Sequence, residues 1–202
     1  MPLTLLQPGV NRLEIQPINW ELLWASYDSA TYQAVLAEIT ADDVVLEIGA
    51  GDLRLACQLA ARAKRVIAIE IQADLLETAV KKINRRLPAN LDLILGDALQ
   101  VRFPVGITAG VLLMRHCTHF TDYAQKLFLI GCRRLITNAR WGMGVETVDL
   151  QAARMPFPSA PPGWFACWCG AVGFKPGMAE TISDEQLNYT NEVTGCPSCL
   201  QS

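Results

Sequence analysis

Short apolar runs alternate with stretches of helical spacing over most of this chain, and no other feature constrains its fold as much. The apolar runs lie at residues 44–51, 65–70, 91–98, 110–116 and 133–139. The stretches with helical spacing lie at residues 29–39, 53–63, 73–87 and 122–132. Strands that alternate with helices form a parallel sheet covered by helices on both faces. The pattern therefore predicts an α/β fold, with Ser29 as the N-cap of the first helix.

The composition is that of a folded protein with one main domain. Apolar residues make up 51% of the 202 positions and charged residues 18%, so apolar burial can offset the entropy of ordering the chain. The net charge of −3 argues against a surface that binds nucleic acid all over, although not against a local basic groove. No run reaches the roughly 18 apolar residues of a membrane span, and the N-terminus lacks the pattern of a signal peptide. We expect a cytoplasmic protein without a membrane partner.

The composition changes near residue 151. Residues 155–163 hold four of the chain's 11 prolines, and paired cysteines follow among aromatic residues. We therefore expect two domains, residues 1–150 with the sheet and residues 151–202 as a small appendage.

A glycine-rich turn ends the first apolar run. Glu47-Ile48-Gly49-Ala50-Gly51 lies where a strand gives way to a helix; glycines there let a backbone approach a ligand, and the helix N-terminus offers free N–H groups. Glu70 ends the second run, where an acid can bind both ribose hydroxyls, and Asp97 ends the third, where a carboxylate can accept from an adenine amino group. A single acid at a strand end is usually just solvated. Three acids at the shared carboxyl edge of a parallel sheet predict a ligand site.

At these residues the chain resembles a known family. VVLEIGAGDLRLACQLAARAKRVIAIEIQADLL (44–76) and NLDLILGDALQVRFP (90–104) are similar to the S-adenosylmethionine-binding half of class I methyltransferases, and most similar to the ribosomal RNA adenine dimethyltransferases. The resemblance implies a Rossmann-like class I methyltransferase sheet that binds S-adenosylmethionine. It also implies that the methionine end is held by Glu47, Gly49, Ala50 and Gly51, the ribose by Glu70 beside Ile71, and the adenine by Asp97 and the backbone of Ala98.

A dinucleotide-binding dehydrogenase is the competing interpretation of the glycine turn. Its G-x-G-x-x-G pattern fails here, because Arg54 occupies the third glycine position. Glu47 beside the turn would also repel a pyrophosphate, whereas it suits the positive sulfonium and ammonium of S-adenosylmethionine. The methyltransferase family usually places a further glycine where Asp52-Leu53 stands, and we interpret this difference as tolerated.

The segment after the fourth run departs from the resemblance. Adenine-N6 methyltransferases carry an Asn-Leu-Pro-Tyr-type motif there, which clamps a flipped base, whereas residues 114–120 read MRHCTHF. Adenine methylation is therefore not carried over. The methyl acceptor stays open among RNA, protein and a small molecule.

Residues of this segment are the candidate catalytic groups. His116 and His119 are the chain's two histidines, and a neutral imidazole can take a proton from an incoming nucleophile. Arg115 can orient an anionic substrate. The alternative is that one histidine caps the following helix or packs under Phe120.

Four of the seven cysteines form two close pairs near the C-terminus. An odd count without a signal peptide does not fit a disulfide framework. We expect Cys167, Cys169, Cys196 and Cys199 to lie on two hairpin tips and to form a tetrahedral Zn²⁺ site, in a zinc-ribbon-like appendage. Free buried thiols or a redox pair are the alternatives. Trp164 or Trp168, if exposed, could stack on a nucleic acid base or a peptide.

The sequence thus favours a methyltransferase whose zinc-binding tail helps to recognise the acceptor, possible acceptors including RNA. The alternative function is a non-catalytic adaptor for RNA or protein that keeps the cofactor and zinc sites.

Overall fold

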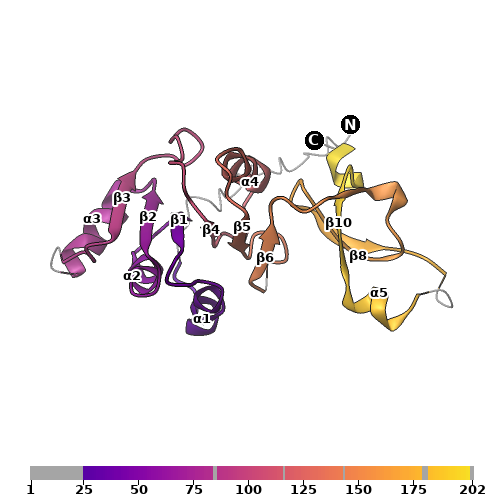
Figure 1. The fold of residues 1–202 in the computed structure, drawn as a ribbon, viewed down its shortest axis with the longest axis horizontal. Coiled ribbons are helices and arrows are strands. Elements are labelled where there is room, and N and C mark those ends of the chain that lie inside the picture. The colour runs from indigo at the N-terminus through magenta and orange to yellow at the C-terminus, as the bar shows by residue number, and fades with distance from the viewer. Residues whose placement is uncertain (1–24, 84–85, 116, 143, 179–181, 201–202) are drawn as a thin grey trace, which may run out of the picture.

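The computed structural model describes residues 25–83, 86–115, 117–142, 144–178 and 182–200. Its larger sheet consists of β1 Val44–Ile48, β2 Arg65–Glu70, β3 Leu91–Leu95, β4 Ala109–Leu112, β5 Arg134–Thr137 and β6 Glu146–Asp149 (Figure 1). The helices around it are α1 Ser29–Ala37, α2 Arg54–Ala60, α3 Ala73–Lys82 and α4 Phe120–Leu129. The strand order is β3-β2-β1-β4-β5-β6. The predicted α/β fold is confirmed.

The edge strand β6 closes the larger sheet on one side. Strands β1 to β5 run parallel to their neighbours, whereas β6 pairs with β5 in the antiparallel sense. Residues Glu146–Asp149 thus complete the larger sheet. Leu150, directly after β6, is buried in the core on the α4 side.

Helices cover both faces of this sheet because successive strand side chains point to opposite faces. In β1, Val45 packs in the cluster that contains α1 and α2, whereas Leu46 packs in the cluster that contains α4. In β4, Gly110 faces α4 so closely that a Cβ atom there would lie 2.5 Å from Leu127 Cδ1. A glycine at this point of β4 is therefore needed for α4 to approach the sheet.

The helix boundaries differ from the predicted ones by a few residues. The N-cap of α1 is Asp28 rather than Ser29, because the Asp28 carboxylate accepts a hydrogen bond from Thr31 N at 2.7 Å. Helix α3 ends at Lys82, short of the predicted residue 87, and α4 begins at Phe120 rather than at residue 122.

A second, smaller sheet follows with the order β7-β10-β8-β9. Its elements are β7 Met155–Pro156, β8 Gly163–Cys167, β9 Val172–Lys175, β10 Thr190–Thr194, the helix α5 Asp184–Asn188 and 3-10 turns at Phe157–Ser159 and Pro197–Leu200. Strand β10 pairs in parallel with β7 and β8, and β9 pairs antiparallel with β8. A small core of Phe165, Cys167 and Val193 lies on one face of this sheet.

Arg140 connects the two sheets. Its side chain is 2% exposed, and its guanidinium donates to both carboxylate oxygens of Glu146 in β6 and of Glu192 in β10, at 2.7 to 3.0 Å. Burial acts to lower the pKa of Arg140, but the hydrogen bonds to the two carboxylates raise it overall, so the group stays charged.

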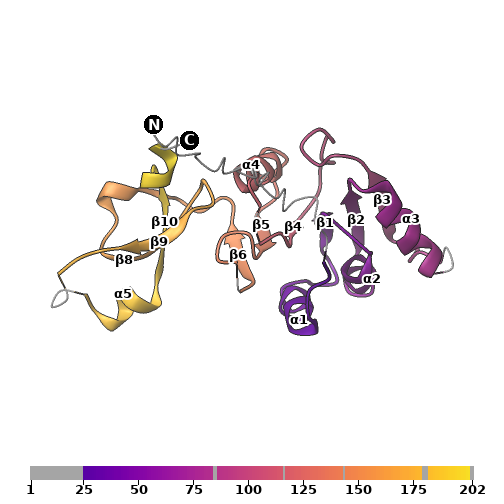
Figure 2. The same cartoon turned by 180° about the vertical axis from the view of Figure 1, so that it is seen from behind.

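The start of α4 also touches the smaller sheet. Thr121 Oγ1 donates to the Trp168 carbonyl at 3.2 Å, and a Cβ atom at Gly170 would lie 3.3 Å from Phe120. Figure 2 shows β8, β9 and β10 beside β6 from the reverse side. The smaller sheet therefore packs against the end of the larger one rather than standing apart.

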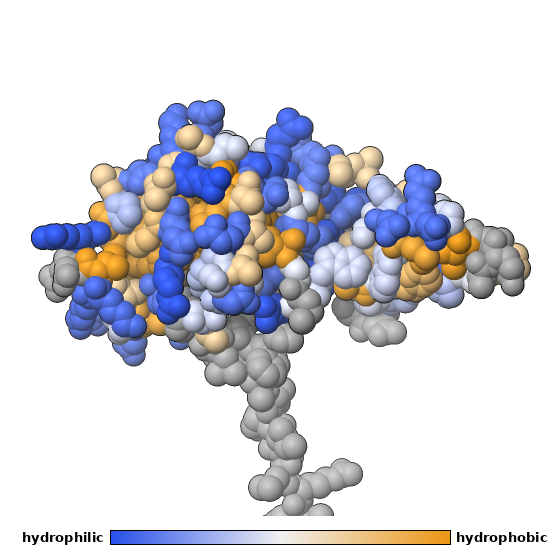
Figure 3. All heavy atoms as spheres, turned by 90° about the horizontal axis from the view of Figure 1, so that it is seen from below, coloured by the Kyte–Doolittle hydropathy of each residue, from blue (hydrophilic) through white to orange (hydrophobic). Residues whose placement is uncertain are grey.

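Both parts expose apolar side chains. Figure 3 shows hydrophilic and hydrophobic side chains mixed on the visible face of the larger part, and hydrophobic side chains below hydrophilic ones on the smaller part. The exposed large apolar side chains of the smaller part are Met155, Trp164, Phe174, Met178, Leu187 and Tyr189. Within the described ranges no helix has both the length and the apolar character needed to cross a membrane.

Replacement of Arg140 by alanine tests the connection between the sheets. We expect Arg140→Ala to lower the free energy of unfolding by about 3 kcal/mol, because Glu146 loses its cation and Glu192 keeps only the longer ion pair with Arg154, at 3.5 Å. Chemical denaturation measures this change, with the exposed Arg133→Ala as the matched control. Equal free energies of unfolding for the two variants would show that the ion pairs of Arg140 do not contribute to stability.

Candidate functional site

A pocket of about 510 Å³ opens where β1, β2 and β4 end, at the carboxyl edge of the larger sheet. It is lined by Ala25, Ser26, Tyr27, Asp28, Tyr32, Glu47, Ile48, Gly49, Ala50, Asp52, Leu55, Glu70, Ile71, Gln72, Leu113, Met114 and Arg115. Of the predicted site residues, the lining includes Glu47, Gly49, Ala50, Glu70, Ile71 and Arg115.

The pocket is acidic. Asp28, Glu47, Asp52 and Glu70 line it, and Arg115 is the only positively charged side chain among the described lining residues. A ligand with positive charge is therefore favoured there over a pyrophosphate.

Glu47 lies in the wall of this pocket without a hydrogen-bond partner for one of its oxygens. Its side chain is buried, the residue being 4% exposed, and Oε2 has no partner within the described part of the chain. Burial, followed by the nearby negative charges of Glu70 and Asp52, raises the pKa of Glu47 well above its ordinary value. A cationic group that donates to Oε2 would satisfy both the missing hydrogen bond and the unfavourable burial.

The backbone N–H groups of the glycine turn are already used. Gly49 N and Ala50 N donate to the Ile69 carbonyl at 2.9 and 3.0 Å. Gly51 N donates to Glu70 Oε2 at 2.7 Å, and Gln72 N donates to Glu70 Oε1 at 2.8 Å. The expected free N–H groups are thus absent at Gly49, Ala50 and Gly51, because the neighbouring strand β2 supplies their acceptors. The Glu70 carboxylate thus stabilises the glycine turn.

Leu53 lies where the methyltransferase pattern usually has its further glycine, and its backbone has a left-handed conformation. Its φ is 63°, beside φ values of 77° for Gly49 and 56° for Gly51. A leucine in this region costs about 1–2 kcal/mol relative to a right-handed conformation. The Leu53 side chain is 1% exposed, so its burial offsets this strain, and the glycine-type turn is kept without the glycine.

Arg115 is the candidate catalytic residue that reaches the pocket. Its guanidinium lies over the Tyr27 ring, 5.0 Å from the centroid, and its backbone N donates to Tyr27 Oη at 3.3 Å. The Nε atom is buried and has no hydrogen-bond partner among the residues that the structure describes.

Of the two histidines, the structure describes only His119. His116 lies outside the described residues. His119 is at the N-cap position of α4 without a side-chain capping bond, and it does not line the pocket. Its Nδ1 lies 3.1 Å from Asp122 Oδ2 and its ring meets Tyr123 edge-on. A catalytic role for either histidine stays a prediction.

Asp97 and Ala98 also lie outside the pocket lining. Asp97 Oδ1 accepts from Leu99 N at 2.8 Å, and the Ala98 carbonyl accepts from Lys126 Nζ at 2.5 Å. Their role at an adenine stays a prediction.

Sequence reasoning missed the wall formed by Tyr27, Asp28 and Tyr32. These residues come from the segment before and inside α1, about 20 positions before the glycine turn. The signal available in the sequence was Asp28, a strong N-cap residue that fixes where α1 begins.

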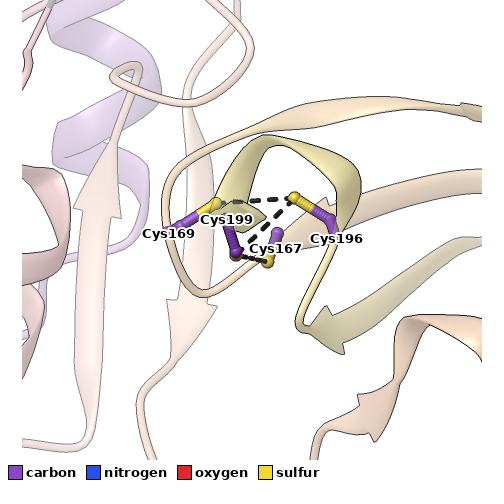
Figure 4. Close-up of side chains that lie close together, drawn as sticks. All are labelled: Cys167, Cys169, Cys196 and Cys199. Atoms are coloured by element: carbon purple, nitrogen blue, oxygen red, sulfur yellow. Dashed lines mark hydrogen bonds between the residues drawn. The ribbon is translucent and has the colours of Figure 1, made fainter. Parts of the chain in front are cut away.

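The four C-terminal cysteines meet in the smaller part (Figure 4). The Sγ atoms of Cys167, Cys169, Cys196 and Cys199 all lie within 4.8 Å of one another. Three of the six Sγ separations are 3.6 Å for Cys167 to Cys199, 3.6 Å for Cys169 to Cys196 and 3.8 Å for Cys196 to Cys199. The chain thus contains a compact four-cysteine cluster of the kind that can hold a metal ion.

The two cysteine pairs come from different local structures. Cys167 ends β8 and Cys169 lies in the turn to β9, as expected for a hairpin tip. The second pair follows β10, with Cys199 on a 3-10 turn, so the prediction of two hairpin tips was wrong for this pair. Burial acts to raise the pKa of Cys196, but hydrogen bonds from Cys199 N and from Cys167 lower it overall to about 7.

Comparisons with known proteins agree with this site. Residues 45–139 match the family model described as a methyltransferase domain. The probable ribosomal RNA small subunit methyltransferase A of Methanosarcina acetivorans is 43% identical over 70 residues, 35% of this chain and 25% of that protein. The ribosomal RNA small subunit methyltransferase A of Moorella thermoacetica is 43% identical over 76 residues, 38% of this chain and 25% of that protein.

A dimethyladenosine transferase structure from Plasmodium falciparum is similar with a TM-score of 0.48 and 24% identity, over 55% of this chain and 41% of that one. This chain spans about a quarter of the length of the relatives it matches in sequence. The matched segment covers the glycine turn, Glu47 and all five parallel strands. Residues 45–139, slightly less than half of the chain, are therefore similar to a methyltransferase domain.

Proposed function

We propose that the chain is an S-adenosylmethionine-dependent methyltransferase. The observation that carries this proposal is Glu47, a buried acid with an unpaired oxygen in an acidic pocket within the methyltransferase domain. The volume of about 510 Å³ falls in the range of small-molecule sites.

The residues of the pocket suggest how the cofactor is held. Glu47 Oε2 accepts from the α-ammonium group and holds it at the end of β1. Glu70 keeps the glycine turn in place and has remaining lone pairs for ribose hydroxyls. When bound, S-adenosylmethionine supplies a methyl group on a positive sulfur. The protein then mainly needs to align the acceptor with this group.

RNA is the acceptor that we propose. The relatives are named as ribosomal RNA methyltransferases. The smaller sheet touches the start of α4, and the segment before α4 is the one that ends at the pocket with Arg115. This short separation in the sequence between Arg115 and Thr121 is our reason to assign recognition of the acceptor to the cysteine-rich tail.

We further propose that the four-cysteine cluster binds a structural Zn²⁺ ion. Zn–S bonds of about 2.3 Å in a tetrahedron place sulfur atoms about 3.8 Å apart. The observed Sγ separations of 3.6 to 3.8 Å fit this geometry. The core of the smaller sheet is small, so a metal ion would contribute much of its stability.

Replacement of Glu47 separates binding from stability. We expect Glu47→Gln to weaken S-adenosylmethionine binding by about 100-fold, because the ammonium loses its anionic partner. At neutral pH the same variant should raise the Tm by about 2–4 °C, since a neutral amide replaces a buried carboxyl group whose ionisation is disfavoured. Calorimetric titration and thermal unfolding measure the two effects, with Glu38→Gln on the exposed end of α1 as the control.

The stability of the wild type should depend on pH through the same residue. In the unfolded chain the Glu47 carboxyl group has its ordinary pKa of 4.5, whereas in the folded protein its pKa is well above this value. Between these two pKa values the folded protein keeps the carboxyl proton and the unfolded chain has lost it. Glu47 therefore stabilises the fold at low pH, and this contribution is lost as the pH rises toward the folded-state pKa. If the stability of Glu47→Gln depended on pH in the same way as that of the wild type, Glu47 would not be the residue responsible.

Transfer of a labelled methyl group tests the activity itself. We expect label from S-adenosylmethionine to enter the RNA fraction of a cell extract, and not its protein or small-molecule fraction, and to be lost with Glu47→Gln. Of the two histidines, His116→Ala should slow transfer by about 100-fold and His119→Ala by less than about threefold, because His119 lies outside the pocket lining. Intact cofactor binding without transfer to any fraction would instead support the non-catalytic adaptor.

Metal analysis tests the zinc proposal. We expect about one zinc per chain in the purified protein, lost in Cys169→Ser together with about 5–10 °C of Tm. Cys57→Ser is the matched control, since Cys57 is a half-buried cysteine on α2 away from the cluster. The proposal would be contradicted if the purified wild type contained no metal and its four cysteines reacted as free thiols. It would also be contradicted if removal of the metal left the stability unchanged.

A further inference from the structure

Two buried atoms of opposite character lack partners in the pocket at the carboxyl edge. One is Glu47 Oε2, an acceptor, and the other is Arg115 Nε, a donor. Both side chains line the same pocket. Within the part of the chain that the structure describes, Arg115 forms no ion pair at contact distance, and it interacts with the Asp28 carboxylate only over a longer distance. A ligand that carries both a cation and an anion would satisfy both atoms.

The glycine turn offers no donor for the anionic part of such a ligand at its three central positions. The N–H groups of Gly49, Ala50 and Gly51 all donate within the protein, to the Ile69 carbonyl and to Glu70. Peptide N–H groups of this kind are the usual alternative to a basic side chain for an anion beside a strand end. Because they are occupied here, the anion must find its donor elsewhere in the pocket.

Arg115 is held in place to act as that donor. Its guanidinium stacks on the Tyr27 ring at 5.0 Å, and its backbone N donates to the Tyr27 hydroxyl. Stacking leaves the edge of the planar guanidinium available, and this edge matches a carboxylate with two parallel hydrogen bonds. Tyr27 therefore limits the orientations of the side chain before a ligand binds.

We propose that Arg115 binds the α-carboxylate of S-adenosylmethionine, while Glu47 binds the α-ammonium of the same methionyl group. This assignment rests on the proposed function and places Arg115 on the cofactor rather than on an anionic acceptor, as the sequence suggested. The pocket then recognises the cofactor by both charges of its amino acid part. Removal of the carboxylate from the ligand and removal of the guanidinium from the protein should have the same effect.

A cycle of ligands and variants tests this pairing. Calorimetric titration compares S-adenosylmethionine with its decarboxylated form, which keeps the sulfonium and the amine but lacks the carboxylate. We expect the wild type to bind the complete ligand about 10–100-fold more tightly. Arg115→Gln should lose this preference and bind the decarboxylated ligand as the wild type does. Arg62→Gln, an exposed arginine outside the pocket, should keep the preference.

Other outcomes overturn the proposal in distinct ways. Equal binding of the two ligands by the wild type would show that no group reads the carboxylate, and this result holds even if Arg115→Gln fails to fold. Unchanged S-adenosylmethionine binding by a folded Arg115→Gln would place Arg115 on the acceptor side. Weakening of both ligands by the same factor would mean that Arg115 only shapes the pocket. Failure of the wild type to bind either ligand would instead overturn the proposed function.

Discussion

The site at the carboxyl edge depends on one buried carboxylate that binds two backbone N–H groups. Glu70, at the end of β2, accepts from Gly51 N and from Gln72 N, so a single side chain fixes both the glycine turn and the start of the chain toward α3. Because Glu70 is satisfied in this way, Glu47 is left as the buried acid whose oxygen has no partner. The two acids lie on neighbouring strands, yet one stabilises the turn, whereas the other lines the pocket with an oxygen that has no partner.

A second constraint is the guanidinium of Arg140 between the two sheets. It meets four carboxylate oxygens while almost fully buried, an arrangement whose desolvation cost is recovered only if both acids stay in place. Glu192 belongs to β10, and the second cysteine pair follows this strand directly. Strand β10 therefore connects the four-cysteine cluster to the larger sheet. The hydrogen bond between Thr121 and Trp168 is a second connection between the two parts.

The sequence predicted the parallel strands well, because each is a local apolar run between polar turns. It also pointed to Glu47, which lines the pocket, and to the four cysteines, which lie together, since their residue types and spacing carry that information. It did not predict that Ile69 and Glu70 would occupy the N–H groups of the turn, because this depends on the register between β1 and β2. Likewise, the Tyr27 wall depends on how a distant segment packs, and no local pattern encodes that.

The fit of Gly170 against Phe120 has a consequence for how this chain could be divided or recombined. A Cβ atom at residue 170 would lie 3.3 Å from Phe120 Cβ, which is unusually close, and the φ of 90° at this position favours glycine. The turn between the first two cysteines therefore fits closely against Phe120, which is itself part of the core of the larger sheet. A foreign module in place of the tail would have to match the start of α4 at this contact.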